Sequence, residues 1–150
     1  MLPAFMAFFH HLFAFTLTAS LVYEFITYRN NMTADEARRM QRMDIVYGIS
    51  AGLLLIVGLL RVFFFEKGLS FYLQSPFFWV KMVTFIIVGL LSIGPTIRFV
   101  RWNQLLKENQ PPVVSEAEFN RTRLILRLEM VGLAIILLSA VFMARGIGFN

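Results

Sequence analysis

Four long apolar stretches, separated by short polar segments, dominate the hydrophobic pattern of this chain. They cover about residues 4–28, 45–65, 76–100 and 124–144. At ~1.5 Å per residue, each stretch is long enough as a helix to cross ~30 Å of hydrocarbon. The pattern predicts an all-α fold, a polytopic membrane four-helix bundle that forms a single transmembrane domain over residues 1–150.

Local signals mark where several of these helices should begin and end. Thr33 and Glu36 match a capping box, as do Ser115 and Glu118, so the second and fourth helices should start directly after Thr33 and Ser115. Gly146 fits the C-terminal cap of the fourth helix, because glycine accepts the left-handed backbone that often ends a helix.

Composition supports the membrane class and excludes several others. The chain is 58% hydrophobic, with a mean hydropathy of +0.69, whereas soluble domains are nearer ~45–50% apolar. The absence of cysteine excludes disulfides and thiolate metal sites. The net charge of +5 lies beside apolar spans, so we attribute it to membrane topology and not to nucleic acid. The first stretch has no basic leading region and is too long for a secretory signal, so we expect a retained span.

Lysine and arginine are distributed unequally between the loops. The loops after the first and third spans hold most of them: Arg29, Arg38, Arg39, Arg42, Arg98, Arg101, Lys107, Arg121 and Arg123. The opposite side has only Arg61, Lys67 and Arg145. The positive-inside rule therefore predicts a multi-pass membrane protein with these two loops in the cytoplasm and both termini on the outer side, which in a bacterial inner (plasma) membrane is the periplasmic side.

Each span also carries a nitrogen-bearing side chain near the predicted outer side. These residues are His10 and His11, Arg61, Lys81 and Arg145. The two histidines lie ~10–15 Å inside the first span and Lys81 lies ~8 Å inside the third. The only carboxylate expected at this level is that of Glu66. Such buried cations would repel one another unless something anionic lies between them.

A haem b or related porphyrin fits this cluster. Neutral imidazole is a common axial ligand of haem iron, so His11, or His10 next to it, is a candidate metal ligand. Lys81 would be a second ligand or a propionate partner, and Arg61 and Arg145 would bind anionic groups. Apolar side chains that could line the slot are Phe8, Phe9, Phe13, Phe63, Phe77, Phe78 and Met82. The two histidines cannot sandwich one iron, because adjacent helical residues point ~100° apart.

Other interpretations remain open at this stage. Arg61, Lys81 and Arg145 could extend toward lipid headgroups, and the histidines could be structural. The cluster could instead serve a cofactor-free protein that binds or transports an anionic lipid or solute. An accessory subunit of a membrane complex, or a homo-oligomer, is also compatible with the pattern. Under the haem interpretation, the partners would be a porphyrin, a quinone or another redox membrane protein.

A second polar cluster is predicted near the cytoplasmic side. Its members are Glu24, Asp44, Arg98, Arg127 and Glu129, with Tyr47 beside them. Glu129 also begins a stripe on the fourth span that continues through Gly132, Ile136, Ser139 and Met143. We interpret the cluster as a belt of salt bridges that fixes helix register; a proton path from the cytoplasm is the alternative.

Three segments resemble a bacterial family of small four-span integral membrane proteins. They read FxHHLxAF around His10 and His11, LLRVFFFEKGLSFYLQSPFFWVKM up to Met82, and GLLSIGPTIRFVRW up to Trp102. The resemblance covers essentially the whole chain. It implies a membrane location and a four-span plan, but no activity.

More distantly, the layout is similar to the HemJ-type protoporphyrinogen IX oxidases, which bind haem b. That resemblance implies roles for an early histidine, here His10 or His11, and for a lysine early in the third span, here Lys81. The resemblance would place a further histidine two positions before the lysine, where this chain has Trp79. It also lacks the Leu-Pro-Arg run of that family's first span. The resemblance thus implies a haem or porphyrin site, and an oxidoreductase of this type, as expectations.

Overall fold

The computed structural model describes residues 1–65 and 68–148, and within these residues it is all-α. Glu66 and Lys67 lie outside the described residues. The elements are α1 (Leu2–Thr27), α2 (Ala34–Leu60), the π-helical turn η1 (Arg61–Phe65), α3 (Leu69–Leu73), α4 (Pro76–Arg101), α5 (Asn103–Lys107) and α6 (Glu116–Ala144). Four of these helical segments are long and apolar enough to cross a membrane. The prediction of an all-α membrane four-helix bundle is confirmed.

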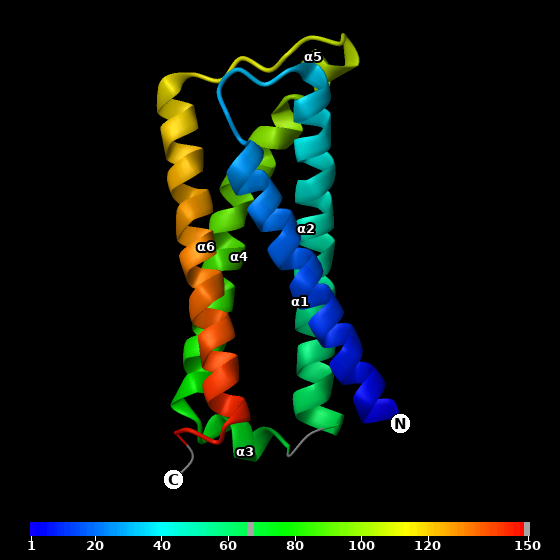
Figure 1. Cartoon of the computed structure of the whole chain (residues 1–150), viewed down its shortest axis with the longest axis vertical. Helices are drawn as coiled ribbons and strands as arrows, with labels where there is room; N and C mark the ends of the chain where they lie inside the picture. The colour runs from blue at the N-terminus through cyan, green and yellow to red at the C-terminus, as the bar shows by residue number, and fades with distance from the viewer. Residues whose placement is uncertain (66–67, 149–150) are drawn as a thin grey trace.

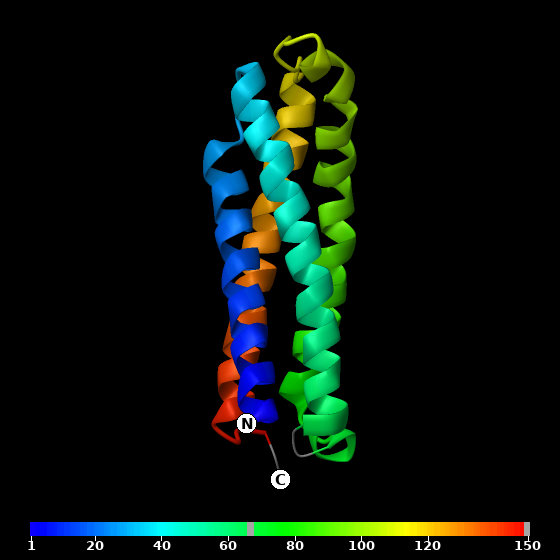
Figure 2. The same ribbon diagram turned by 90° about the vertical axis from the view of Figure 1, so that its right-hand side faces the viewer.

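The four long helices form one elongated bundle (Figures 1 and 2). The start of α1, the end of α6 and the short helix α3 lie together at one end, which we call the terminal end. Helix α5 and the two longer connections lie at the opposite end, which we call the loop end. That the loop end faces the cytoplasm remains a prediction of the positive-inside rule.

Both predicted helix starts are correct, but only one capping box is complete. The Thr33 backbone N–H donates to the Glu36 carboxylate at 2.9 Å, and the Thr33 hydroxyl accepts from the Glu36 N–H at 3.3 Å. At the start of α6, the Ser115 hydroxyl accepts from the Glu118 N–H at 3.2 Å. The Glu118 carboxylate instead lies 4.0 Å from Arg98 of α4, so a contact between two helices replaces the second half of this box.

The end of α6 has the geometry expected for a helix that terminates at glycine. Gly146 has a φ of 70°, and its N–H donates to the Met143 carbonyl at 3.1 Å. The Ile147 N–H donates to the Phe142 carbonyl at 3.0 Å. These two bonds satisfy carbonyl groups that the helix itself leaves without partners, so Gly146 caps α6 as its sequence position predicts.

The bundle is built from two helix pairs whose packing differs along its length. Helix α1 packs mainly on α2, and α4 packs mainly on α6. Towards the loop end the two pairs share a buried apolar core, whose members include Leu21, Tyr28, Ala37, Met40, Phe99, Trp102, Leu106 and Leu126. The connections at this end are held by polar bonds as well: an Arg29–Glu36 ion pair anchors the start of α2.

Arg38 joins α2 to α5 and to the connection between α5 and α6. Its guanidinium donates to the Leu106 carbonyl at 2.8 Å and to the Asn109 side-chain oxygen at 2.7 Å. We expect Arg38→Ala to lower the free energy of unfolding in detergent by ~1–3 kcal/mol, because two charge-assisted hydrogen bonds are lost. Arg39→Ala is the matched control, since Arg39 is exposed. Equal effects of the two variants would contradict this prediction.

Candidate functional site

A cavity of about 490 Å³ lies between the two helix pairs towards the terminal end. All four long helices contribute to its wall, and Phe71 and Tyr72 of α3 line it as well. Its polar lining consists of His10, His11, Arg61, Tyr72 and Lys81. We call this space the terminal cavity. Its volume falls within the ~300–1,000 Å³ that is typical of small-molecule sites.

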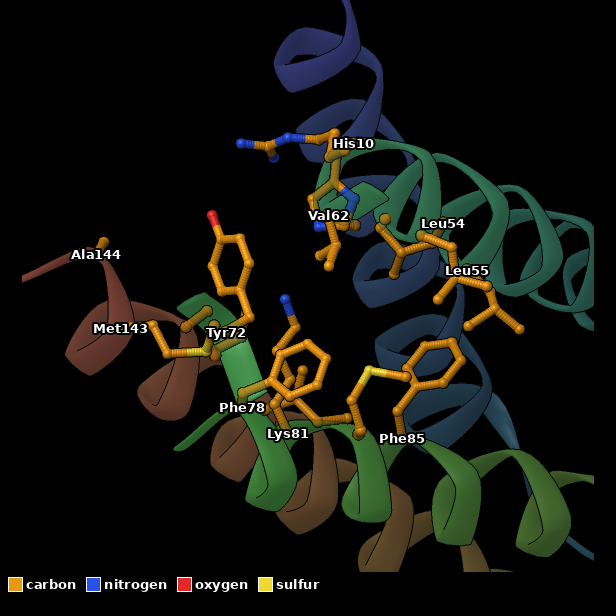
Figure 3. Close-up of a pocket in the computed structure, with 18 of the residues that line it drawn as sticks. His10, Leu54, Leu55, Val62, Tyr72, Phe78, Lys81, Phe85, Met143 and Ala144 are labelled. Atoms are coloured by element: carbon orange, nitrogen blue, oxygen red, sulfur yellow. The ribbon is translucent and has the colours of Figure 1, made fainter. Parts of the chain in front are cut away.

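His10 faces the neighbouring helix α2 and the terminal cavity (Figure 3). The absence of a side chain at Gly58 allows this, because a Cβ there would lie 3.2 Å from the His10 Cε1 atom. His11 is more exposed, and its Nδ1 lies 2.6 Å from the Ala7 carbonyl oxygen of its own helix. The planes of the two rings are inclined at 88° to each other, and their centroids lie 6.2 Å apart.

Two cationic side chains approach the same space from opposite helix pairs. Figure 3 shows Lys81 projecting from α4 into the terminal cavity, with His10 and Val62 on the far side. Arg61, the first residue of η1, also lines the cavity and is close enough to Lys81 to repel it electrostatically. The cavity therefore combines an imidazole with two like charges, an arrangement that attracts anionic groups.

The apolar wall differs from the one expected from sequence. Of the seven predicted residues, Phe78 and Met82 line the cavity. The five others are not among the lining residues: Phe8, Phe9 and Phe63 are exposed, Phe77 packs on Phe142, and Phe13 packs against the core. Sequence reasoning missed Phe71, Tyr72, Phe85 and Met143. Helical spacing alone could have identified Phe85, because it follows Phe78 by two turns on the helix face that carries Lys81.

Arg145 is the one predicted member of the outer cluster that the structure does not bring into the terminal cavity. It caps α6 and is exposed, because the helix ends just before it and the chain turns at Gly146. Glu66, the predicted counter-charge, lies outside the described residues.

A separate group of acidic side chains lies inside the bundle, between the terminal cavity and the loop end. Glu24 of α1, Asp44 of α2 and Glu129 of α6 interact electrostatically with one another, and we call them the carboxylate cluster. The Asp44 carboxylate accepts a hydrogen bond from Thr96 of α4 at 2.8 Å. The Tyr47 side chain lies beside that of Glu129. The structure thus brings together the three predicted acids and the neighbouring tyrosine.

The two arginines predicted for the same cluster lie elsewhere. Arg98 donates to the Thr122 hydroxyl and, at 3.3 Å, to the Glu118 carbonyl. Arg127 is exposed. Among the described residues, no ion pair joins either arginine to Glu24, Asp44 or Glu129. The expected belt of salt bridges is therefore not what the described contacts show. The stripe that continues along α6 is nevertheless internal, with Gly132, Ile136 and Ser139 buried.

These features define a small polytopic helical membrane protein with a ligand-sized cavity among its helices and buried acids between that cavity and the loop end. The chain belongs to the family described as Predicted membrane protein (DUF2214), whose model matches residues 2–148. This match confirms the predicted family of small membrane proteins. No curated protein and no solved structure matches the chain significantly.

Proposed function

We propose that this protein binds an amphipathic anion in the terminal cavity, and that the ligand is a haem b or a related porphyrin. The observation that supports the proposal is the convergence of His10, Arg61 and Lys81 on one apolar cavity. A ligand that is apolar over most of its surface and anionic at one edge would satisfy both the wall and the two cations. It would also relieve the repulsion between Arg61 and Lys81.

The residues present fit the needs of a haem. His10 is the preferred axial ligand, since its ring faces the cavity and is less exposed than that of His11. Arg61 and Lys81 would hold the propionates. Phe78, Phe85 and other apolar lining residues would contact the macrocycle. When bound, the haem would supply one-electron redox chemistry, and the protein's contribution would be to bind and orient it.

This proposal includes a redox or porphyrin-oxidising role at a bacterial inner membrane. The electron partner would be a quinone or another membrane protein, reached within the bilayer or at its surface. A cavity that is bounded by membrane-spanning helices would receive such apolar partners directly from the lipid.

An absorption spectrum of the detergent-purified protein, expressed with haem precursor supplied, tests the proposal. We expect a Soret band, and visible bands that sharpen on dithionite reduction. His10→Ala should lose these bands, whereas the matched variant His11→Ala should keep them. The absence of visible absorption in the wild-type protein, even after hemin is added, would refute haem binding.

The second candidate is a cofactor-free protein that binds or transports an anionic lipid or solute in the same cavity. Arg61 and Lys81 favour it, because two converging cations alone suffice for such a ligand. Thermal unfolding separates the two candidates, since a ligand that binds only the folded state raises the midpoint with its occupancy. Stabilisation by an anionic phospholipid, together with no response to hemin, would establish this second function instead.

A further inference from the structure

The carboxylate cluster has no role in the proposed ligand site, yet it is among the most deeply buried polar features of the bundle. Glu24 is only 2% exposed, Glu129 is 1% exposed and Asp44 is 6% exposed. Each comes from a different helix, so the cluster depends on the packing of α1, α2 and α6. Burying three ionised carboxylates together is energetically unfavourable unless each gains a hydrogen-bond partner or a proton.

Two of these acids have oxygen atoms that are buried without a partner. Among the described residues, the Oε1 atoms of Glu24 and Glu129 make no hydrogen bond, although the Tyr47 side chain interacts with that of Glu129. Both side chains are more than nine-tenths buried and lie within electrostatic range of each other. An ionised carboxylate in this position would have no counter-charge among the described residues, whereas a protonated carboxyl group is neutral and can itself donate.

Side chains from all four long helices face the carboxylate cluster. Helix α1 contributes Glu24, α2 contributes Asp44 and Tyr47, and α6 contributes Glu129. From α4 the facing group is the hydroxyl of Thr96, which is not ionisable at accessible pH. The next charged side chain along α4, Arg98, is bound by Thr122 and Glu118 towards the loop end.

We propose that Glu24, Asp44 and Glu129 form a proton-binding site inside the membrane-spanning bundle. A proton taken from water forms an O–H bond on one carboxylate oxygen, and the same bond breaks when the proton returns to water. A metal ion is the less suitable ligand, because no group of three or more His, Cys, Asp or Glu side chains among the described residues is arranged to hold one.

Further polar side chains lie between the cluster and the loop end. Tyr28 follows Glu24 by one helical turn, and its side chain lies beside Thr122. Thr122 in turn accepts from Arg98, which also approaches the partly exposed carboxylate of Glu118. These side chains lie between the cluster and the end of the bundle that the positive-inside rule assigns to the cytoplasm, and among the described residues the Tyr28 hydroxyl is buried without a hydrogen-bond partner.

Infrared spectra of the full chain in lipid bilayers, recorded in H₂O and in D₂O and compared as a difference, test the proposal. At neutral pH every exposed carboxyl group is ionised, so a carbonyl band of protonated carboxylic acid that shifts in D₂O reports buried protons. We expect this band in the wild-type protein, with part of its intensity lost in Glu24→Gln and another part lost in Glu129→Gln. Glu116→Gln, in the exposed first turn of α6, is the matched control and should leave the band unchanged.

The wild-type measurement is decisive on its own, even if a variant fails to fold. Absence of the band between pH ~5 and pH ~9 would overturn the proposal. Loss of the band when sodium chloride replaces choline chloride at constant pH would also overturn it, and would identify a monovalent-cation site instead. Neither result depends on haem or lipid binding in the terminal cavity.

Discussion

Replacing Gly132 by alanine is expected to lower the free energy of unfolding by about 1–3 kcal/mol, the usual cost of overpacking a tight core. A Cβ at this position would clash with the Val88 Cγ2 atom of α4. Valine is stiff at χ1 in a helix, so Val88 cannot rotate away and the backbones of α4 and α6 must separate. Chemical or thermal unfolding of the purified protein in detergent measures the effect.

Gly89 provides the matched control for this substitution. It is next to Val88 on α4, but a Cβ there would meet nothing within 4 Å. Gly89→Ala should therefore be neutral or stabilising, by up to ~1 kcal/mol from helix propensity. Val88→Ala combined with Gly132→Ala should restore much of the lost stability, because the clashing methyl group is gone. A similar loss in Gly132→Ala and Gly89→Ala would show that the α4–α6 contact is not as close as described.

Replacing Lys81 by glutamate is expected to weaken the binding of an anionic ligand in the terminal cavity by ~10–100-fold or more. The change removes a charge-assisted contact worth ~1.5–3 kcal/mol and adds a repulsive charge. Lys81 projects into the cavity from the same helical face as Phe78 and Phe85, so the loss is electrostatic and leaves the wall intact. Equilibrium titration with hemin, and separately with an anionic phospholipid, measures the two affinities.

Lys107→Glu is the control for the general effect of charge. Lys107 is exposed in α5 at the loop end, whereas the cavity lies towards the terminal end. Lys81→Arg should retain most of the affinity, because it keeps the charge. If Lys107→Glu weakened binding as much as Lys81→Glu does, the ligand would be responding to the net charge of the protein and not to this cavity.

The spans and helix starts were predictable because each depends on local sequence. A membrane-spanning helix needs only a long apolar stretch, and the cap at Thr33 involves residues within one turn of each other. The helix start at Ser115 was also predictable, but the partner of the Glu118 carboxylate was not. Its carboxylate is drawn to Arg98, a residue of another helix, and no local pattern contains that contact.

The candidate site was predictable in its members more than in its arrangement. Depth along each helix follows from residue number, which is why His10, Arg61 and Lys81 could be assigned to one level. Rotation about each helix axis does not follow in the same way. A single residue step turns the side chain by ~100°, so the choice between His10 and His11 depends on where α2 places Gly58.

By itself, the sequence determined that this protein is an all-α membrane bundle of four spans, because hydrocarbon requires helices with internally satisfied backbones. It also placed acids and cations at two depths. Only the tertiary structure decided their partners: Arg98 binds Thr122 and Glu118, which leaves Glu24 and Glu129 together with no cation among the residues that the structure describes. Lateral contacts between helices set those partners, and such contacts depend on the packing of all four helices at once.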